Sequence, residues 1–160
     1  MRRSVFSVAT AIAVLALTAG SVVAALTWKS GPTFVQNSNG SFTATGEATG
    51  LGNTPVIATI VVSGTVRYTC VNKGSNPSPG QNPVPSTTSG SQDLGNSDHN
   101  GRGVLDLTVS FAPAATVGGK TAGCPNGNWQ GVNPQQQGPV SATLTLTQGG
   151  KVIYTAKLPQ

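Results

Sequence analysis

The stretch that decides the fold is residues 56–71, which read VIATIVVSGTVRYTCV. Even positions hold apolar or small residues throughout, whereas odd positions carry most of the hydroxyl side chains and Arg67. This alternation predicts a β-strand with one buried face. A tight hairpin at Ser63 and Gly64 would move the apolar residues to odd positions after the turn, and they stay on even ones. We therefore predict one long strand, with a bend allowed at Gly64 and with Cys70 directed inward near its end.

Other segments alternate in the same way, and turn residues separate them. They are 26–28 and 33–35, 41–49 after an Asn39-Gly40 turn, a polar edge strand at 86–94, 103–112, and a C-terminal hairpin turned at Gly149-Gly150. Each strand of that hairpin is expected to direct its apolar residues inward. These residues are Ala142, Leu144 and Leu146 on the first strand and Val152, Tyr154, Ala156 and Leu158 on the second. No segment after the N-terminal region has a helical pattern. The sequence predicts an all-β, antiparallel, immunoglobulin-like β-sandwich of seven or eight strands, with residues 72–85 and 113–139 as long loops.

The N-terminal residues have the layout of a secretory signal peptide. Arg2 and Arg3 precede an apolar run that ends in small residues around Ala24. This order predicts a signal peptide over residues 1–24 and a single domain over residues 25–160, with cleavage after Ala25 nearly as good. A membrane anchor is the alternative, but the apolar run is shorter than the roughly 20 residues that span a bilayer. We expect a secreted, extracellular protein with no membrane association after cleavage, exported by the general secretory route rather than the twin-arginine route.

Charge and composition narrow the classes of partner. Without Arg2 and Arg3 the chain has seven Lys and Arg residues against four Asp and Glu residues. The basic residues are scattered along the sequence, so nothing indicates a nucleic-acid partner. Glycine, proline and neutral polar residues dominate, which suits strands joined by turns in an extracellular protein. We expect a monomer.

The two cysteines, Cys70 and Cys124, are expected to form a disulfide, because an exported chain meets an oxidising environment. A zinc site is the alternative, but two isolated cysteines and a single histidine do not supply its ligands. The bridge would bring the end of the long strand to the loop that carries Trp129. It would thereby gather a possible ligand-binding set: Trp129, Asn72, Asn76, Gln81, Asn82, Asn126 and Asn128.

Amides around an exposed aromatic ring suit a glycan or a protein partner, since the ring stacks while the amides form hydrogen bonds. The alternative is that these asparagines shape turns and that Trp129 covers the core.

Catalytic and metal sites are not indicated. Asp98 and His99 lie side by side, but no nucleophile motif accompanies them. Residues 96–101 resemble the start of a calcium loop, yet Leu107 occupies the position where such a loop needs Glu. The four acidic residues left after signal removal form no evident pair in the sequence. We expect no enzyme activity, no metal and no cofactor.

Two segments carry a resemblance: Cys70 to Asn82, which reads CVNKGSNPSPGQN, and Gly123 to Trp129, which reads GCPNGNW. Together with Asn100-Gly101-Arg102 and the threonine-rich strands, they resemble an uncharacterised family of small exported actinobacterial proteins. The resemblance implies secretion, a β-sandwich and one disulfide, and it implies no activity and no functional residues.

The leading functional expectation is a secreted, non-enzymatic binding or structural module for an extracellular protein or a glycan, associated with the cell envelope. The alternative is a secreted inhibitor or antagonist that uses the proline-rich loop 72–85. The third is a hydrolase that uses Asp98 and His99.

Overall fold

The structure is a computed structural model, and it describes residues 27–51, 54–95 and 101–158. These residues form nine strands and one short helix: β1 (Thr27–Gln36), β2 (Phe42–Thr49), β3 (Val56–Val71), β4 (Pro77–Pro79), β5 (Val84–Asp93), β6 (Gly103–Val109), β7 (Thr116–Gly118), α1 (Gly119–Ala122), β8 (Gln130–Gln148) and β9 (Lys151–Leu158). Every strand pair is antiparallel. The predicted all-β, antiparallel class is therefore confirmed, with nine described strands in place of seven or eight.

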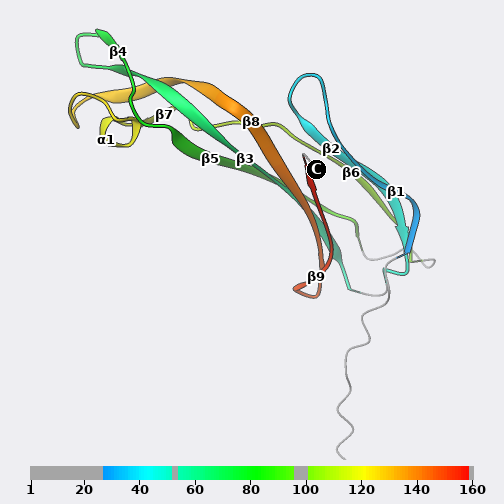
Figure 1. Cartoon of the computed structure of the whole chain (residues 1–160). Coiled ribbons are helices and arrows are strands. Elements are labelled where there is room, and N and C mark those ends of the chain that lie inside the picture. Colours follow the sequence, from blue (N-terminus) through cyan, green and yellow to red (C-terminus); the bar gives the residue numbers. More distant parts are fainter. Residues whose placement is uncertain (1–26, 52–53, 96–100, 159–160) are drawn as a thin grey trace, which may run out of the picture.

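The strands form two sheets (Figure 1). Sheet A has three strands in the order β1-β2-β6. Sheet B is built on the two longest strands, β3 and β8, which pair along most of their length. Strand β5 pairs with the first part of β3 and β4 with its end, while β7 and β9 pair with opposite ends of β8.

The prediction of one long strand over residues 56–71 is confirmed, because β3 has these bounds. Its pairing with β8 shifts register between Ser63 and Thr65. A Cβ atom at Gly64 would lie 2.7 Å from a methyl of Val140 and 3.0 Å from the ring of Phe111. Glycine is therefore needed at this position because neighbouring side chains pack closely against it beside the register shift.

The main core lies between the two sheets. Even-numbered residues of β3 and of β8 supply one side of it, and alternate residues of β2 and β6 supply the other. Its buried residues include Phe42, Ala44, Leu105 and Val109 from sheet A, and Val56, Ala58, Ile60, Val62, Ala142, Leu144 and Leu146 from sheet B. Burying such aliphatic side chains contributes about 1.5–3 kcal/mol each relative to exposure, so this core is the main source of stability.

Five local predictions were wrong. The expected loop 72–85 contains β4 and the first two residues of β5. The strand expected over 103–112 ends at Val109. The two extended pieces at 26–28 and 33–35 form the single strand β1, described from Thr27 and irregular in its centre. The expected loop 113–139 contains β7, α1 and the first part of β8, whose polar and glycine-rich sequence hides its alternation. The expected inward position of Val152 is also wrong, since this residue is 63% exposed. A bulge opposite Leu146 and Thr147 lets the adjacent residues Ile153 and Tyr154 both pack on the core.

Candidate functional site

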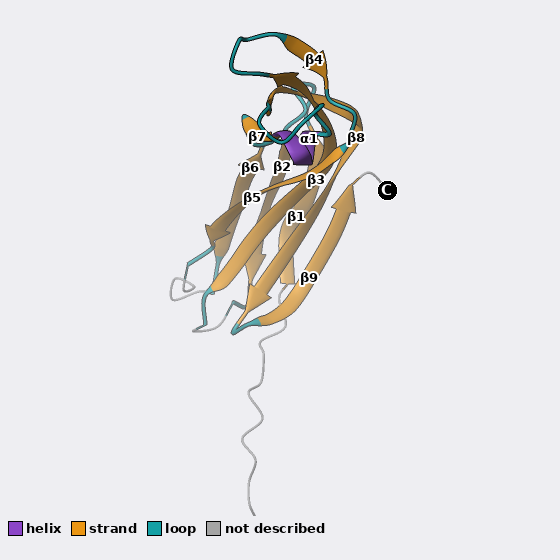
Figure 2. Ribbon diagram, turned by 90° about the vertical axis from the view of Figure 1, so that its left-hand side faces the viewer, coloured by secondary structure: helices purple, strands orange, loops and turns teal. Residues whose placement is uncertain are grey.

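One end of sheet B extends beyond sheet A and carries a separate cap (Figures 1 and 2). We call residues 72–83 and 119–129 the distal tip; it comprises β4, α1 and the loops around them. Helix α1 packs against β3, β7 and β8, which all belong to sheet B. The first described residue, Thr27, lies at the opposite end of the molecule (Figure 1). The distal tip is thus the end farthest from the described N-terminus.

A second, smaller core supports the distal tip. Its buried residues are Val66, Tyr68 and Cys70 from β3 and Ala122 from α1. The hydroxyl of Tyr68 donates a hydrogen bond of 2.8 Å to the carbonyl of Ala114, which holds the segment before β7 against β3. This core exists because β3 continues its inward alternation past the edge of sheet A, where α1 and the neighbouring loops cover it.

The segment 119–129 of the distal tip is joined to the end of β3 by the predicted disulfide, which is confirmed. The Cα atoms of Cys70 and Cys124 lie 5.6 Å apart, and the bridge closes a sequence separation of 54 residues. Such a disulfide is compatible with an extracellular protein.

Backbone hydrogen bonds add three more ties. The N–H of Gly80 donates to the carbonyl of Tyr68 at 2.9 Å. The N–H groups of Gln81 and Asn82 donate to the carbonyls of Gly123 and Ala122 at 3.3 and 3.2 Å. These bonds connect the proline-rich loop to both β3 and the end of α1, so its conformation is set before any partner arrives.

Glycine makes the close approach of the two loops possible. Gly123 ends α1 with φ of 67°, in the left-handed region. A Cβ atom on Gly123 would lie 2.6 Å from the side chain of Asn82 and 2.8 Å from its backbone nitrogen. Any other residue would therefore force the loops apart.

The predicted amide set is gathered at the distal tip, but several of its members hold turns. The Oδ1 atom of Asn72 accepts hydrogen bonds from the N–H groups of Gly74 and Asn76, at 2.9 and 3.0 Å. Asn126 accepts the N–H of Asn128 in the same manner, at 3.0 Å. These side chains shape the loops, which is the alternative that the sequence left open.

The remaining members divide in the same way. Asn82 donates from its side chain to the carbonyl of Thr121 at 3.3 Å, and Gln81 donates to that of Pro79 at 3.3 Å. Trp129 is half-buried and packs against the second core. Three of these residues are exposed to solvent: Asn76, Gln81 and Asn128. Part of the Trp129 ring therefore serves the second core, and the ligand-binding role predicted for it stays a prediction.

The open edge of β4 is closed to further strand pairing. Ser78 pairs with Cys70, and Gly80 donates to β3, so the even-numbered residues direct their backbone polar groups toward β3. Pro77 and Pro79 lie between them and direct their nitrogens to the open edge. Proline has no N–H group, so this edge offers no donors to an incoming strand. The outer edge of β4 is therefore a poor template for strand addition.

The distal tip has a simple charge pattern. It contains two exposed basic residues, Lys73 and Lys120, and its sequence contains no acidic residue. Acidic residues occur at Glu47, Asp93, Asp98 and Asp106, none of them in the distal tip. The surface is therefore polar and mildly basic, and it suits a neutral or acidic partner.

The remaining predicted features either lie outside the described residues or make contacts that stabilise the fold. Residues 1–24, which carry the signal pattern, and Asp98 and His99 lie outside the described residues. Glu47 forms ion pairs, and Asp93 accepts the N–H of Gly95 in its own turn at 2.8 Å.

Within the described ranges, no group of three or more potential metal ligands is found. The helix that the structure describes has four residues, and no described helix is long and apolar enough to cross a membrane.

Comparison with protein families, with curated proteins and with solved structures finds no match for this chain.

Proposed function

We propose that the chain is an exported, non-enzymatic binding module that contacts an extracellular partner through its distal tip. The observation that carries the proposal is that backbone hydrogen bonds join residues 80–82 to β3 and to residues 122–123, while the disulfide joins residue 124 to the end of β3. Loops that are fixed before binding lose little conformational entropy on association, and this raises affinity. Export rests on the N-terminal pattern of residues 1–24, and we propose an immunoglobulin-like arrangement of the sheets and a monomer.

A protein partner suits this surface better than a glycan. The tip presents exposed prolines at Pro77, Pro79 and Pro83, while Trp129 is half-buried in the second core. Rigid prolines and exposed amides form contact area and hydrogen bonds with a polypeptide. At the tip, Trp129 is the residue predicted to stack on a sugar, and its packing against the second core leaves less of its ring available.

An inhibitor or antagonist is the second candidate. The specific observation is that residues 76–82 are held on both sides, by β3 and by the segment that follows α1, while their prolines stay exposed. A rigid exposed loop of this kind can occupy the cleft of an enzyme without rearranging. Inhibition of an extracellular enzyme that stops when residues 76–82 are replaced by a flexible Gly-Ser segment supports this candidate.

The proposal is tested by tip variants that leave the turns intact. We choose Lys73→Glu combined with Gln81→Ala, because both side chains are exposed. The matched control is Lys151→Glu, an exposed lysine beside the β8–β9 turn, at the other end of sheet B (Figure 1).

The mature protein is used to capture partners from the culture medium and cell-envelope fractions of its own host. We expect wild type and Lys151→Glu to capture the same protein and the tip variant to lose at least tenfold of it. Equal capture by all three proteins, or no capture by wild type, contradicts the proposal.

A further inference from the structure

The outer face of sheet A contains a hollow that the distal tip does not explain. It arises from an irregularity in β1, where Ser30 pairs with Glu47 and Thr33 pairs with Thr45. Gly31 and Pro32 therefore lie opposite Gly46 alone, so β1 has one extra residue here. A bulge of this kind disrupts the pairing locally and bends the strand, and bulges are frequent beside functional sites.

The irregular segment requires glycine. Gly31 has φ of 80°, in the left-handed region. A Cβ atom there would lie 2.8 Å from the nitrogen of Thr33 and 2.9 Å from the carbonyl oxygen of Thr45. Glycine therefore lets this segment of β1 lie close to the backbone of β2 without a clash.

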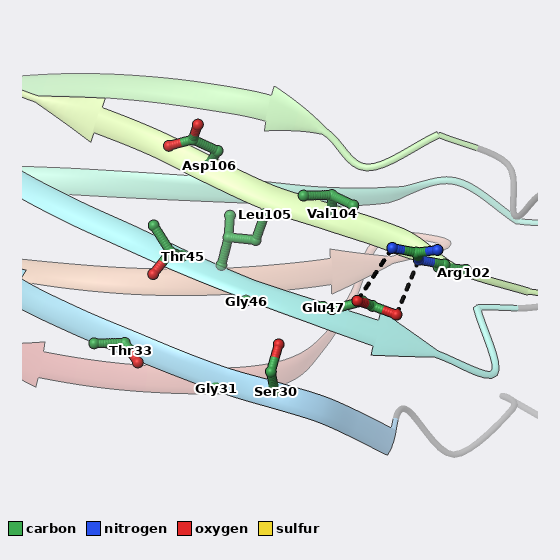
Figure 3. A pocket seen from close by; sticks show the side chains of 10 residues that line it. All are labelled: Ser30, Gly31, Thr33, Thr45, Gly46, Glu47, Arg102, Val104, Leu105 and Asp106. Atoms are coloured by element: carbon green, nitrogen blue, oxygen red, sulfur yellow. Dashed lines mark hydrogen bonds and ion pairs between the residues drawn. The ribbon is translucent and has the colours of Figure 1, made fainter.

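The resulting hollow has a volume of about 510 Å³ (Figure 3). This lies in the range of about 300–1,000 Å³ that is typical of small-molecule sites. Its wall includes the hydroxyl-bearing residues Ser30, Thr33 and Thr45, and the side chain of Val104, which is 54% exposed. It is also open to solvent, as expected for a site on the outer face of a sheet.

Fixed charges stand at one end of the hollow. The Glu47 side chain is only 18% exposed, and its Oε1 atom lies 3.0 Å from Nζ of Lys29 and 2.9 Å from Nε of Arg102. Arg102 also donates from Nη2 to Oε2 of Glu47 at 3.2 Å, so the contact is two-pronged (Figure 3). Such geometry holds the guanidinium group in place.

The hollow has a second carboxylate, that of Asp106. This residue pairs with Thr45 and lies two positions after Val104, which pairs with Glu47. Its exposed side chain belongs to the same hollow (Figure 3). A residue of sheet B, Gln92 of β5, holds the backbone of β6 at this point. The N–H of Asp106 donates to Oε1 of Gln92 at 2.9 Å, and Nε2 of Gln92 donates to the carbonyl of Val104 at 3.1 Å. The part of the wall formed by β6 is therefore held by β2 on one side and by Gln92 on the other.

We propose that this hollow binds a saccharide unit. The threonine and serine hydroxyls can donate and accept hydrogen bonds with sugar hydroxyls, the carboxylate of Asp106 can accept them, and Val104 offers an apolar contact for a face of the ring. The cations are balanced by Glu47 and Asp106, so an anion gains little there. The inference goes beyond the proposed function, since it gives the molecule a second binding site on sheet A.

The experiment uses the mature, oxidised protein labelled with ¹⁵N. Oligosaccharides that contain N-acetylglucosamine, mannose or galactose are titrated while the backbone amide shifts are followed. We expect at least one of these sugars to shift the amides of Thr45, Val104 and Asp106 in a saturable manner. The variants Asp106→Asn and Thr45→Val should each weaken binding at least tenfold, whereas Thr155→Val, an exposed mid-strand threonine of β9, should bind as wild type does.

Two outcomes overturn the inference: none of the sugars shifts the hollow amides, or Asp106→Asn and Thr45→Val both bind as tightly as wild type. Amide spectra of the free variants show that each is folded. The tip variant Lys73→Glu with Gln81→Ala should keep wild-type sugar affinity. Loss of partner capture without loss of sugar binding therefore separates failure of one proposal from failure of the other.

Discussion

Removing the disulfide should loosen the distal tip before the rest of the molecule. The bridge between Cys70 and Cys124 spans 54 residues, and the chain-entropy treatment of such a loop gives about 4 kcal/mol. That is a large share of the roughly 5–15 kcal/mol by which most domains are stable. Among the described residues the second core has four buried members and the main core has fifteen, so the tip has little other support.

The assay compares oxidised wild type with the double variant Cys70→Ser and Cys124→Ser in urea unfolding and in amide hydrogen exchange. We expect about 4 kcal/mol lower stability and loss of protection at the amides of Gly80, Gln81 and Asn82. Wild type treated with a reductant serves as the control and should behave as the double variant does. A stability loss below about 1 kcal/mol, or unchanged protection of these three amides, would refute the reasoning.

Further predictions concern glycine, core packing and one buried hydroxyl. Gly31→Ala should destabilise the protein more than Gly40→Ala does in urea unfolding. Both glycines have positive φ, but only Gly31 has backbone atoms within 3 Å of the added Cβ atom. Gly40→Ala should cost about 1 kcal/mol, and equal losses of stability would contradict this reasoning. Leu144→Ala should lower stability by about 2–5 kcal/mol, and Val152→Ala should stay within about 0.5 kcal/mol, since one side chain is fully buried and the other mostly exposed. Tyr68→Phe should lose about 1 kcal/mol with its hydrogen bond, and no change in the urea midpoint would show that this bond is unimportant.

The sequence predicted the fold best where one face is apolar. Strand β3 alternates clearly, and its extent was predicted correctly; β6 also alternates, but it ends at Val109, three residues before the predicted end. The first part of β8 was missed because its side chains are mostly polar or glycine, and its inner face is covered by α1 and not by a second sheet. Val152 was misplaced because a bulge changes which residues point inward, and a bulge has no signature in the alternation.

The candidate site was predicted in part. The two cysteines located the distal tip, because only one pairing within the chain was available to them. The roles of its amides could not be predicted, since asparagine suits both a turn and a ligand contact. The hollow on sheet A was missed altogether. It depends on the pairing of Glu47 with Lys29 and Arg102, which lie far apart in the sequence, and its one local signal was Gly31 followed by proline.

Site-specific crosslinking tests most directly whether the distal tip is the contact surface. The photoreactive residue benzoylphenylalanine replaces Gln81 in one protein and Thr155 in another, and each mature protein is illuminated in the culture of its own host. Both positions are exposed, one at the tip and the other on β9. We predict a single crosslinked adduct from position 81 and none of that mass from position 155. The same adduct from both positions, or an adduct from position 155 alone, would contradict the proposal.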